Sequence, residues 1–301
     1  MKILVCICTY KRNKNLKECL ESFNKAIIPD NVKISFLILD NSINYESSRL
    51  LGNFKKKFKF DIQSANEKKR GVVYARNKCL KISKKIECDY ITFFDDDCKI
   101  DKYWFKNVLK ILGKYKVNIV TGPQLYLDED SKKKNLGEIF EKKVDKELSK
   151  VSWAATNNVI FKKDIILKEN IYFDINLNKF GMGEDQLFFS KLYKKGYEII
   201  WSNNIKVFEK LHYHRLNKKW IKERSYRLGV LGNYIDRSLN GQILGYIINY
   251  FKFLYYLFLS IFSLLNIIKK NYPNQFINLF FRSIGRFLGP FVFKKIKFYK
   301  K

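Results

Sequence analysis

The feature that most constrains the fold is an alternation of short, almost uninterrupted apolar runs with segments of helical periodicity. Apolar runs of strand length occupy Ile3 to Cys8, Ile34 to Leu39 and Tyr90 to Phe94. Such runs are typical of parallel strands that are buried on both faces. Between the first two runs, apolar residues recur at steps of four and three, as on one face of a helix. The alternation predicts an α/β fold with a doubly wound, mostly parallel sheet flanked by helices.

Later segments continue the pattern. "FKFDIQS" predicts a weaker strand, and "GVVYARNKCLKI", which starts at Gly71, predicts a helix. "WAATNNVIFKK" (Trp153 to Lys163) predicts a further strand, and a helix beginning near Glu184 is followed by a stop at Gly196 and another strand. Because no long linker interrupts this region, we expect residues 1–240 to form one catalytic domain and residues 241–301 a separate helical extension.

Polar residues follow the predicted strands at their carboxyl ends, where ligands bind in open α/β sheets. They are "CTYKRN" after the first strand, Asp40 to Ser42 after the second, and Asp95, Asp96 and Asp97 after the third. Three adjacent carboxylates resist ionisation together unless a cation lies between them. A bound metal is one explanation. A solvated acidic turn, or an N-cap for the helix expected in "KYWFKNVLKIL", is the alternative.

The net charge of +30, from 59 Lys and Arg against 29 Asp and Glu, favours an anionic partner. Nucleic acid, an anionic membrane face and phosphorylated small molecules all qualify. A basic nucleic-acid-binding protein has no need of three carboxylates at a strand end, since these repel phosphate unless a metal is bound. We therefore expect no nucleic acid partner and keep such a protein as the alternative. The six cysteines lack a CxxC pair, which predicts reduced thiols.

Five motifs occur in a familiar order. "CTYKRNKNLKECLES", "LILDNS", "GVVYARN", "FFDDDC" and "GMGEDQLFFSKLYKKGYEIIW" together resemble the family 2 glycosyltransferases with the GT-A fold. The following "VFEKLHYHRLNKKWIKERSYRLG" is most similar to the succinoglycan glucosyltransferase type of bacterial polysaccharide enzymes. The resemblance covers roughly Lys2 to Gly232. It implies transfer of a sugar, with inversion, from a nucleotide donor (usually a UDP-sugar) to an acceptor hydroxyl. A catalytically inactive GT-A scaffold is the alternative within the family.

The resemblance implies a divalent metal, Mn²⁺ or Mg²⁺, at the Asp-x-Asp element of the family. Asp97 would be the direct ligand, and Asp95 or Asp96 would lie nearer the ribose, with Asp95 also a candidate ligand. Carboxylate oxygens are the ligands that these hard cations prefer. Either His212 or His214 would complete the metal site, because neutral imidazole is a competent ligand. Exposed loop histidines are the alternative for this pair.

The Glu-Asp motif of the family falls on Glu184 and Asp185. Asp185 would be the general base that takes the proton of the acceptor hydroxyl, and Glu184 would orient it or contact the acceptor. The alternative is that both carboxylates only interact with the dipole of a helix N-terminus.

Donor recognition is carried over in the same way. Asp40 would accept a hydrogen bond from uracil, Thr9 and Tyr10 would contact base or ribose, and Arg12 and Arg76 would reach base or phosphate. For Asp40 the alternative is an ordinary turn residue, which "DNS" also fits.

Two further groups could contact the diphosphate or the acceptor. Asn157 and Asn158 form an amide pair near the start of a predicted strand. Trp220, Arg224 and Arg227 share one helical face, and guanidinium groups match phosphate geometry. An ordinary basic helix face is the alternative for these three.

The C-terminal region predicts two helices with amphipathic character. Ile243 to Ile268 is almost entirely apolar and would form a helix about 39 Å long, enough to cross a bilayer core. Its polar residues recur as a stripe, which favours a helix in the membrane interface or packed on protein. Phe276 to Phe293 carries Asn278, Arg282 and Arg286 four residues apart and resembles a basic amphipathic helix. Covering a dimer interface or the core of the domain is the alternative for both.

These features together predict the location of the protein. The first apolar run is shorter than a signal-peptide core, so we expect the chain on the cytoplasmic face of the inner membrane. It would be peripheral or monotopic there, with a transmembrane span as the alternative, and anionic lipid would attract the lysine-rich end. The expected partners are a nucleotide-sugar donor and a lipid-linked or glycan acceptor in the synthesis of cell-surface glycans.

Overall fold

The computed structural model describes residues 1–127, 144, 146–210, 215, 217–270 and 273–295. These residues form two compact units, which are described separately. We call the described residues up to Lys210 the N-terminal unit and those from 215 onward the C-terminal unit.

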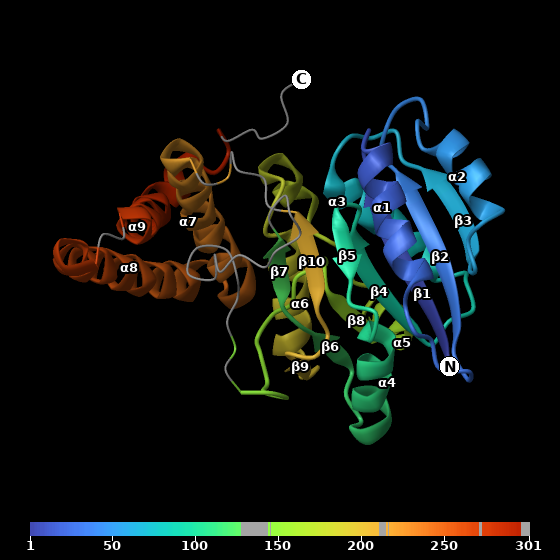
Figure 1. Ribbon diagram of the computed structural model, residues 1–301. Coiled ribbons are helices and arrows are strands. Elements are labelled where there is room, and N and C mark those ends of the chain that lie inside the picture. The colour runs from blue at the N-terminus through green and yellow to red at the C-terminus, as the bar shows by residue number, and fades with distance from the viewer. Residues whose placement is uncertain (128–143, 145, 211–214, 216, 271–272, 296–301) are drawn as a thin grey trace. The chain divides into compact units, whose positions relative to one another are not determined.

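The N-terminal unit is organised around a sheet of seven strands in the order β3-β2-β1-β4-β8-β6-β9. Within the described residues, β8 alone runs antiparallel to its neighbours in this sheet. The expected mostly parallel sheet is therefore confirmed (Figure 1). The strands are β1 (Lys2–Thr9), β2 (Lys33–Asp40), β3 (Asp61–Asn66), β4 (Tyr90–Asp95), β6 (Ile119–Thr121), β8 (Val159–Lys162) and β9 (Ile199–Trp201).

Helices cover both faces of this sheet, as the continuous apolar runs require. Along β1, Ile3 and Val5 belong to one hydrophobic cluster, and Leu4 and Cys6 belong to the other. The first cluster includes residues of α1 (Asn13–Asn24), α2 (Ser48–Lys55) and α4 (Trp104–Lys114). The second includes residues of α3 (Val72–Ser83), α5 (Lys163–Glu169) and α6 (Glu184–Lys194). The central strands are thus buried on both sides, as the doubly wound arrangement predicts.

A second, three-stranded sheet was not predicted. It consists of β5 (Cys98–Ile100), β10 (Val207–Lys210) and β7 (Gln124–Leu127), with β10 in the middle. The strand β10 pairs antiparallel with β5 and parallel with β7. Strands of three or four residues carry too little periodicity to be recognised from one sequence. Since β5 follows the aspartates directly, this sheet fixes the chain on their far side.

Two element boundaries differ from the expectation. The strand expected from Trp153 begins only at Val159, and the helix α5 begins already at Lys163. The residues before Val159 are irregular, and the side chains of Asn157 and Asn158 donate to Gln124 and to the carbonyls of Pro123 and Ile205. The helix α4 begins at Trp104, and the side chain of Asp101 accepts a hydrogen bond from the N–H of Tyr103 at 2.8 Å. The three aspartates therefore do not cap α4.

The C-terminal unit consists, in its described residues, of α7 (Lys218–Asn240), α8 (Gln242–Lys270) and α9 (Pro273–Val292). Glycines let α7 and α9 approach closely. A Cβ atom on Gly229 would lie 2.2 Å from the carbonyl oxygen of Arg282, and one on Gly285 would lie 2.1 Å from that of Tyr226. Such contacts exclude any larger residue, and small residues at helix interfaces are typical of helices that associate within membranes.

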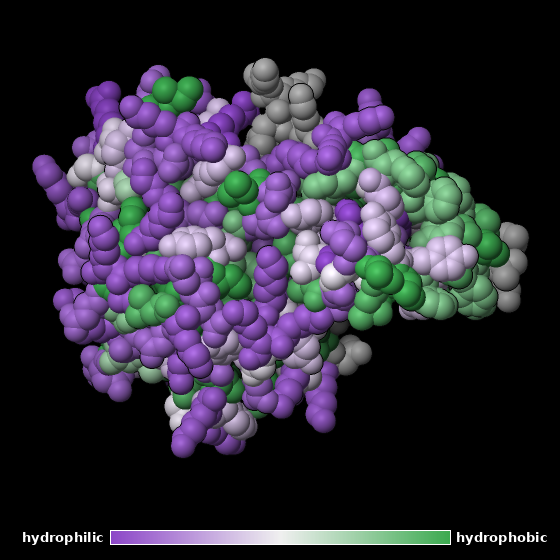
Figure 2. All heavy atoms as spheres, turned by 180° about the vertical axis from the view of Figure 1, so that it is seen from behind, coloured by the Kyte–Doolittle hydropathy of each residue, from purple (hydrophilic) through white to green (hydrophobic). Residues whose placement is uncertain are grey.

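The helix α8 turns its polar stripe inward and its apolar side outward. Asn249, Ser260 and Ser263 are at most 5% exposed, whereas Phe251 and Phe258 are each 65% exposed. Figure 2 shows hydrophobic side chains gathered over the helices of this unit. Gln242–Leu264 is long and apolar enough to cross a membrane by length and composition. This polarity is the reverse of that of a surface helix in water.

The basic stripe of α9 also lies within the unit. Arg286 is 5% exposed, and its guanidinium donates to Asp236 of α7 at 2.7 Å and to Asn249 of α8 at 3.0 Å. Asn278 accepts a hydrogen bond from the hydroxyl of Ser225 on α7 at 2.8 Å. Two of the residues that make α9 resemble a basic amphipathic helix, Asn278 and Arg286, therefore link it to α7 and α8.

Candidate active site

The sheet register brings the polar strand ends into line. Thr9 at the end of β1 lies opposite Asp40 at the end of β2, and Asp40 lies opposite Asn66 at the end of β3. On the other side of β1, Cys8 lies opposite Asp95 at the end of β4. Residues that are far apart in the sequence therefore meet at one edge of the sheet, as expected for a ligand site.

The first loop holds two of the three aspartates. The hydroxyl of Thr9 donates to Asp96 at 2.7 Å, and Arg12 forms ion pairs with Asp96 at 2.9 Å and with Asp97 at 2.8 Å. Asp96 is fully buried. Burial raises the pKa of Asp96 to about 7, although Arg12 opposes the shift. The triplet is thus a fixed part of the site, and a solvated acidic turn does not describe it.

Arg76 joins the aspartates to the Glu-Asp motif. Its guanidinium lies 2.9 Å from Asp95 and also pairs with Glu184, and its side chain is 8% exposed. Burial by itself lowers the pKa of Arg76, but the carboxylates of Glu184 and Asp95 raise it above its usual value. Arg76 therefore stays a cation between the end of β4 and the start of α6. Its guanidinium binds carboxylates of the chain in this structure, and the contact with a base or a phosphate that the resemblance implies stays a prediction.

The position of Arg76 depends on how α3 begins. Gly71 precedes the helix with φ of 132°, in the region that favours glycine, and its N–H donates to Asn41 at 2.7 Å. The side chain of Asn178 occupies the place of a Cβ atom on Gly71 and accepts from the N–H of Val73 at 3.3 Å. Loops after β2 and before α6 thus fix the first turn of α3 and the arginine one turn later.

Two glycines set up the Glu-Asp motif. Gly181 and Gly183 adopt left-handed φ values of 62° and 85°, and Glu184 begins α6 directly afterwards. Glu184 is 3% exposed, and burial raises its pKa to about 7. Its Oε2 atom is buried without a hydrogen-bond partner among the described residues. Because Glu184 pairs with Arg76, an interaction with the helix dipole alone does not account for it.

Asp185 lies beside Glu184 and is only half-buried. Its carboxylate accepts hydrogen bonds from the N–H of Gln186 at 2.7 Å and from the N–H of Thr156 at 3.3 Å. Burial raises its pKa, and Arg76 opposes that shift. A carboxylate that is held by two backbone groups, partly open and more basic than usual can accept a proton.

The residues expected to bind the nucleoside lie at the ends of β1 and β2. Asp40 is 1% exposed, and its two oxygens accept from the N–H groups of Ser42 and Ser47, each at 2.7 Å. These are the contacts of a turn residue, and they lower the pKa of Asp40 against the opposing effect of burial. The ring of Tyr10 is half-buried, with the guanidinium of Arg70 5.2 Å from its centre.

The amide pair divides between two roles. Asn158 is 1% exposed, accepts from the indole of Trp104 at 2.9 Å and donates to the carbonyl of Ile205 at 2.7 Å, so it is part of the scaffold. Asn157 is half-buried and donates to Gln124, which in turn donates to Glu209.

The remaining predicted site residues belong to the C-terminal unit or fall outside the described residues. Trp220, Arg224 and Arg227 are on α7 of the C-terminal unit, where the guanidinium of Arg224 lies 5.2 Å from the Trp220 ring. His212 and His214 fall outside the part of the chain that the structure describes, so their proposed role as ligands stays a prediction.

The carboxylates suit a metal site in which phosphate oxygens of a bound substrate supply some of the ligands. Asp95 and Asp97 each present one oxygen to an arginine and keep a second oxygen that accepts no hydrogen bond from a described residue. Within the described residues, no three His, Cys, Asp or Glu side chains gather as a complete ligand set. Mg²⁺ and similar cations are commonly held by one or two carboxylates together with phosphate oxygens and water. The donor set fits that kind of site.

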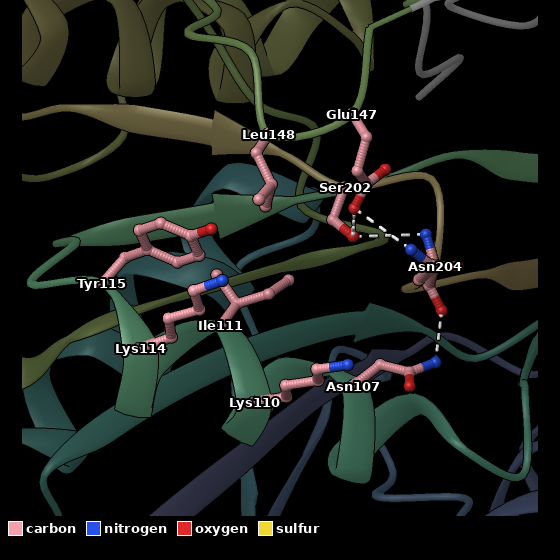
Figure 3. Close-up of a pocket in the computed structure, with 9 residues that line it drawn as sticks. All are labelled: Asn107, Lys110, Ile111, Lys114, Tyr115, Glu147, Leu148, Ser202 and Asn204. Carbon is pink, nitrogen blue, oxygen red and sulfur yellow. Dashed lines mark hydrogen bonds between the residues drawn. The ribbon is translucent and has the colours of Figure 1, made fainter.

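A separate pocket of about 370 Å³ lies between α4 and the segment that follows β9 (Figure 3). Glu147 accepts a hydrogen bond there from the hydroxyl of Ser202 at 2.6 Å. The lining contains no residue predicted for the site. It consists of Asn107, Lys110, Ile111, Lys114, Tyr115, Glu147, Leu148, Ser202 and Asn204.

The sequence predicts candidate site residues but not the contacts that they make with one another. It assigned Arg12 and Arg76 to the donor, whereas both bind carboxylates of the chain itself. A usable signal was present. Two arginines near five acidic side chains in one crevice would be expected to pair with some of them, because buried carboxylates need counter-charges.

The chain matches a known protein family over the region that contains most of these residues. The model of the family described as "Glycosyl transferase family 2" matches residues 4–178, more than half of the chain. This range contains the first loop, the aspartates and Arg76. The curated succinoglycan biosynthesis protein ExoM of Rhizobium meliloti (strain 1021) is 24% identical over 231 residues, which make up 76% of this chain and 73% of that protein.

Solved structures share the fold. The mannosyltransferase PcManGT from Pyrobaculum calidifontis, in complex with GDP-Man and Mn²⁺, has a TM-score of 0.62 at 12% identity over 96% of this chain and 87% of its own. S. aureus TarS 1-349 in complex with UDP-GlcNAc has a TM-score of 0.55 at 15% identity over 95% and 81%. Other TarS matches cover 66% and 44% of those chains. These likenesses confirm the expected GT-A fold.

Proposed function

The chain belongs to glycosyl transferase family 2, and we propose that it is an inverting, metal-dependent enzyme that uses a nucleotide-sugar donor. That it is a glycosyltransferase follows from the family. The donor, probed first as a UDP-sugar, the metal and the acceptor are the proposal. Within it, residues 1–240 carry catalysis, and residues 241–301 associate with the membrane.

The observation that carries the proposal is the link through Arg76. It joins Asp95, one of the candidate metal ligands, to Glu184, the neighbour of the candidate base. A glycosyl transfer needs a group that stabilises the departing diphosphate and a group that deprotonates the acceptor, and both must act on one sugar. The arginine holds the two sets of carboxylates at adjoining positions, as this chemistry requires.

Asp97 and Asp95 would hold the divalent metal through their free oxygens. When bound, the cation supplies positive charge that stabilises the leaving diphosphate. Arg12 keeps the Asp97 carboxylate in place, and Thr9 keeps Asp96 in place beneath it. These residues would thereby hold the donor at the carboxyl ends of β1 and β4. The Mn²⁺ in the PcManGT complex supports a divalent metal for a fold of this kind.

Asp185 would accept the proton of the acceptor hydroxyl. Its backbone hydrogen bonds fix the carboxylate, and its raised pKa makes the ionised form a stronger base. Attack from the side opposite the departing diphosphate would invert the anomeric carbon. Glu184 and Arg76 touch each other in the free protein and would orient Asp185 rather than take the proton themselves.

The acceptor would be a lipid-linked or polysaccharide glycan at the cytoplasmic face of the inner membrane. Two observations support this part. ExoM is a succinoglycan biosynthesis protein by its description. The outward side of α8 is apolar, and exposed apolar surfaces of this size mark membrane or protein contacts.

A thermal-shift screen of nucleotide sugars tests the proposal. The purified protein is heated with UDP-, GDP- and dTDP-sugars, each with Mn²⁺ and with EDTA. We expect one nucleotide class to raise the melting temperature with Mn²⁺ and to do so weakly with EDTA, because a ligand of the folded state stabilises it. If no nucleotide sugar shifts the melting temperature under either condition, the proposed donor site is wrong.

A further inference from the structure

The C-terminal unit contains a cluster of charges around a buried Asp236–Arg286 pair, and the described residues of the unit do not balance these charges. Asp236 of α7 accepts from Lys252 of α8 at 2.6 Å and from Arg286 of α9 at 2.7 Å. Both side chains of the Asp236–Arg286 pair are 6% exposed. One carboxylate thus serves two cations. A third cation, Arg282, lies one helical turn before Arg286 on α9.

Within the described residues of this unit, the acids are Glu223 and Asp236. The charge of Glu223 acts on Arg227, which lies four residues later on α7. Lys252 and Arg286 therefore share Asp236 as the one carboxylate of the cluster, and Arg282 lies beside Arg286 against the Tyr256 ring. Buried charges without a partner are strongly unfavourable, and in apolar surroundings they pair with one another or with a ligand. The cluster has an excess of positive charge that calls for an anion.

Arg282 is the cation with free donors. Its guanidinium lies 4.7 Å from the centre of the Tyr256 ring on α8, and that of Arg286 lies 5.5 Å from the same ring. The guanidinium of Arg282 donates no hydrogen bond to any residue that the structure describes, and its Nε atom is buried. The Nε atom of Arg286 is also buried without an acceptor. Two guanidinium groups with unused donors thus flank one tyrosine.

We propose that Arg282, Arg286 and Tyr256 bind the phosphate group of a membrane lipid. Guanidinium groups bind phosphate oxygens through paired, charge-assisted hydrogen bonds, and a tyrosine hydroxyl is a further donor. The apolar side of α8 would contact the acyl chains of the same lipid layer. The inference rests on the membrane association proposed above, and it adds a specific ligand to that association.

The site also indicates how the helices lie in the membrane. Tyr256 and Arg282 are near the middle of α8 and α9, so a spanning helix would place them near the bilayer centre, far from any phosphate. A helix in the interface is immersed by about 5–10 Å and is itself about 10 Å across. With its exposed aromatic side immersed, α8 would hold its inward polar stripe at the depth of the phosphates. An interfacial orientation follows.

Native mass spectrometry of the full chain, released from a neutral detergent, tests the site. The protein is incubated with phosphatidylglycerol or with a polyprenyl diphosphate, and bound lipid is counted. We expect one retained lipid per wild-type chain. Arg282→Gln should lower the retained fraction about tenfold or more, since it removes the free guanidinium. The lipid that gives the stronger retention identifies a structural headgroup or a lipid-linked acceptor as the source of the phosphate.

Arg237→Gln is the matched control. Arg237 of α7 also lies over a tyrosine, with its guanidinium 4.9 Å from the Tyr246 ring, but it donates to Asn233, Gln242 and Tyr246. It should change lipid retention less than about twofold, although it removes the same charge. If Arg282→Gln fails to fold, Tyr256→Phe tests the site instead. This variant keeps the ring but removes the hydroxyl donor, so it should still lower the retained fraction of lipid.

Three results would overturn the inference. Arg282→Gln could retain as much lipid as the wild type, or Arg237→Gln could lose as much lipid as Arg282→Gln does. Millimolar inorganic phosphate could also stabilise the protein as much as the lipid does. The last would mean that the ligand is a free anion. Binding to neutral vesicles separates this test from the proposed function. Arg282→Gln should bind such vesicles as the wild type does, so a failure of membrane association would appear in both proteins.

Discussion

Among single residues, Arg76 has the most influence on the site. It is a buried cation that pairs with carboxylates from β4 and α6, and it is placed by a glycine turn at the start of α3. The neighbouring acids then differ in character. Glu184 is enclosed and paired, whereas Asp185 is half-buried and held by backbone groups. This difference supports the proposal that Glu184 orients and Asp185 accepts the proton.

Replacing Asp185 with asparagine should slow turnover and leave donor binding unchanged. Asparagine can keep the side-chain position but cannot take the proton, so turnover should fall about 10²- to 10⁴-fold. Donor affinity, measured by calorimetric titration, should stay within about twofold. The control is Asp164→Asn on the exposed side of α5, which should leave both quantities unchanged. Wild-type turnover in Asp185→Asn would refute the assignment of the base.

Glu184 should make the stability of the metal-free protein depend on pH. Its pKa is about 7 in the folded protein against a usual 4.5, so the folded state keeps a proton that the unfolded state releases. The stabilising contribution is complete below about pH 4.5 and is lost as pH rises through about 7.

Urea unfolding at a series of pH values measures this effect. The unfolding free energy should fall from pH 4.5 to 7 more steeply in the wild type than in Glu184→Gln. The exposed Glu198→Gln should behave as the wild type does. Parallel curves for wild type and Glu184→Gln would show that Glu184 ionises normally.

At the scale of elements, the strand ends were predictable and the contacts between loops were not. The apolar runs located β1, β2 and β4 within one residue at each end, because strands buried on both faces have continuous apolar sequences. Those strands in turn placed Asp40 and Asp95 at one edge of the sheet. The pairing of Arg12 and Arg76 with carboxylates depends on loop geometry that carries no periodic signal.

The C-terminal helices show a second limit of prediction from the sequence. Their lengths and polar stripes were visible in the sequence, but the side on which each stripe would lie was not. A polar stripe faces water in a surface helix and faces the other helices in a membrane-associated one. The contact of Asp236 with Lys252 and Arg286, which lies on the inward side of these helices, joins residues on three helices.

The close packing of α7 and α9 should make Gly285 intolerant of any side chain. A Cβ atom there would lie 2.1 Å from the carbonyl oxygen of Tyr226, so Gly285→Ala should destabilise the helices by about 1–3 kcal/mol or more. Gly113→Ala on α4 is the same change in open space and should be neutral or slightly stabilising. Thermal unfolding followed by circular dichroism compares the two. Equal melting temperatures would mean that the helices separate easily at this point.

At the scale of the whole molecule, the chain combines a sheet with a buried apolar core and a helix, α8, whose polar side chains face inward and whose apolar side chains face outward. If the proposed membrane association holds, the net charge of +30 contributes to it, since anionic lipid attracts a basic protein and the apolar side of α8 can enter the interface. An enzyme held in this way would meet a lipid-linked acceptor at the membrane and a nucleotide sugar from the cytoplasm.

A single exposed phenylalanine tests the membrane contact. Phe258 is 65% exposed on α8, and burial of a phenylalanine side chain in lipid is worth about 1.5–3 kcal/mol. Phe258→Glu should therefore lower vesicle binding in a sedimentation assay by about tenfold or more. The control is Tyr193→Glu at an exposed position of α6, which should bind vesicles nearly as the wild type does. Undiminished binding by Phe258→Glu would indicate that α8 contacts protein instead.

The aspartates at the end of β4 are proposed to hold a metal for a nucleotide diphosphate. Calorimetric titration of UDP, with and without Mn²⁺, into the wild type and Asp97→Asn tests this proposal most directly. Mn²⁺ should tighten UDP binding to the wild type by about tenfold or more, about 1.4 kcal/mol, and should change binding to Asp97→Asn by less than about twofold. An equal response to Mn²⁺ in both proteins, or none in the wild type, would contradict the claim.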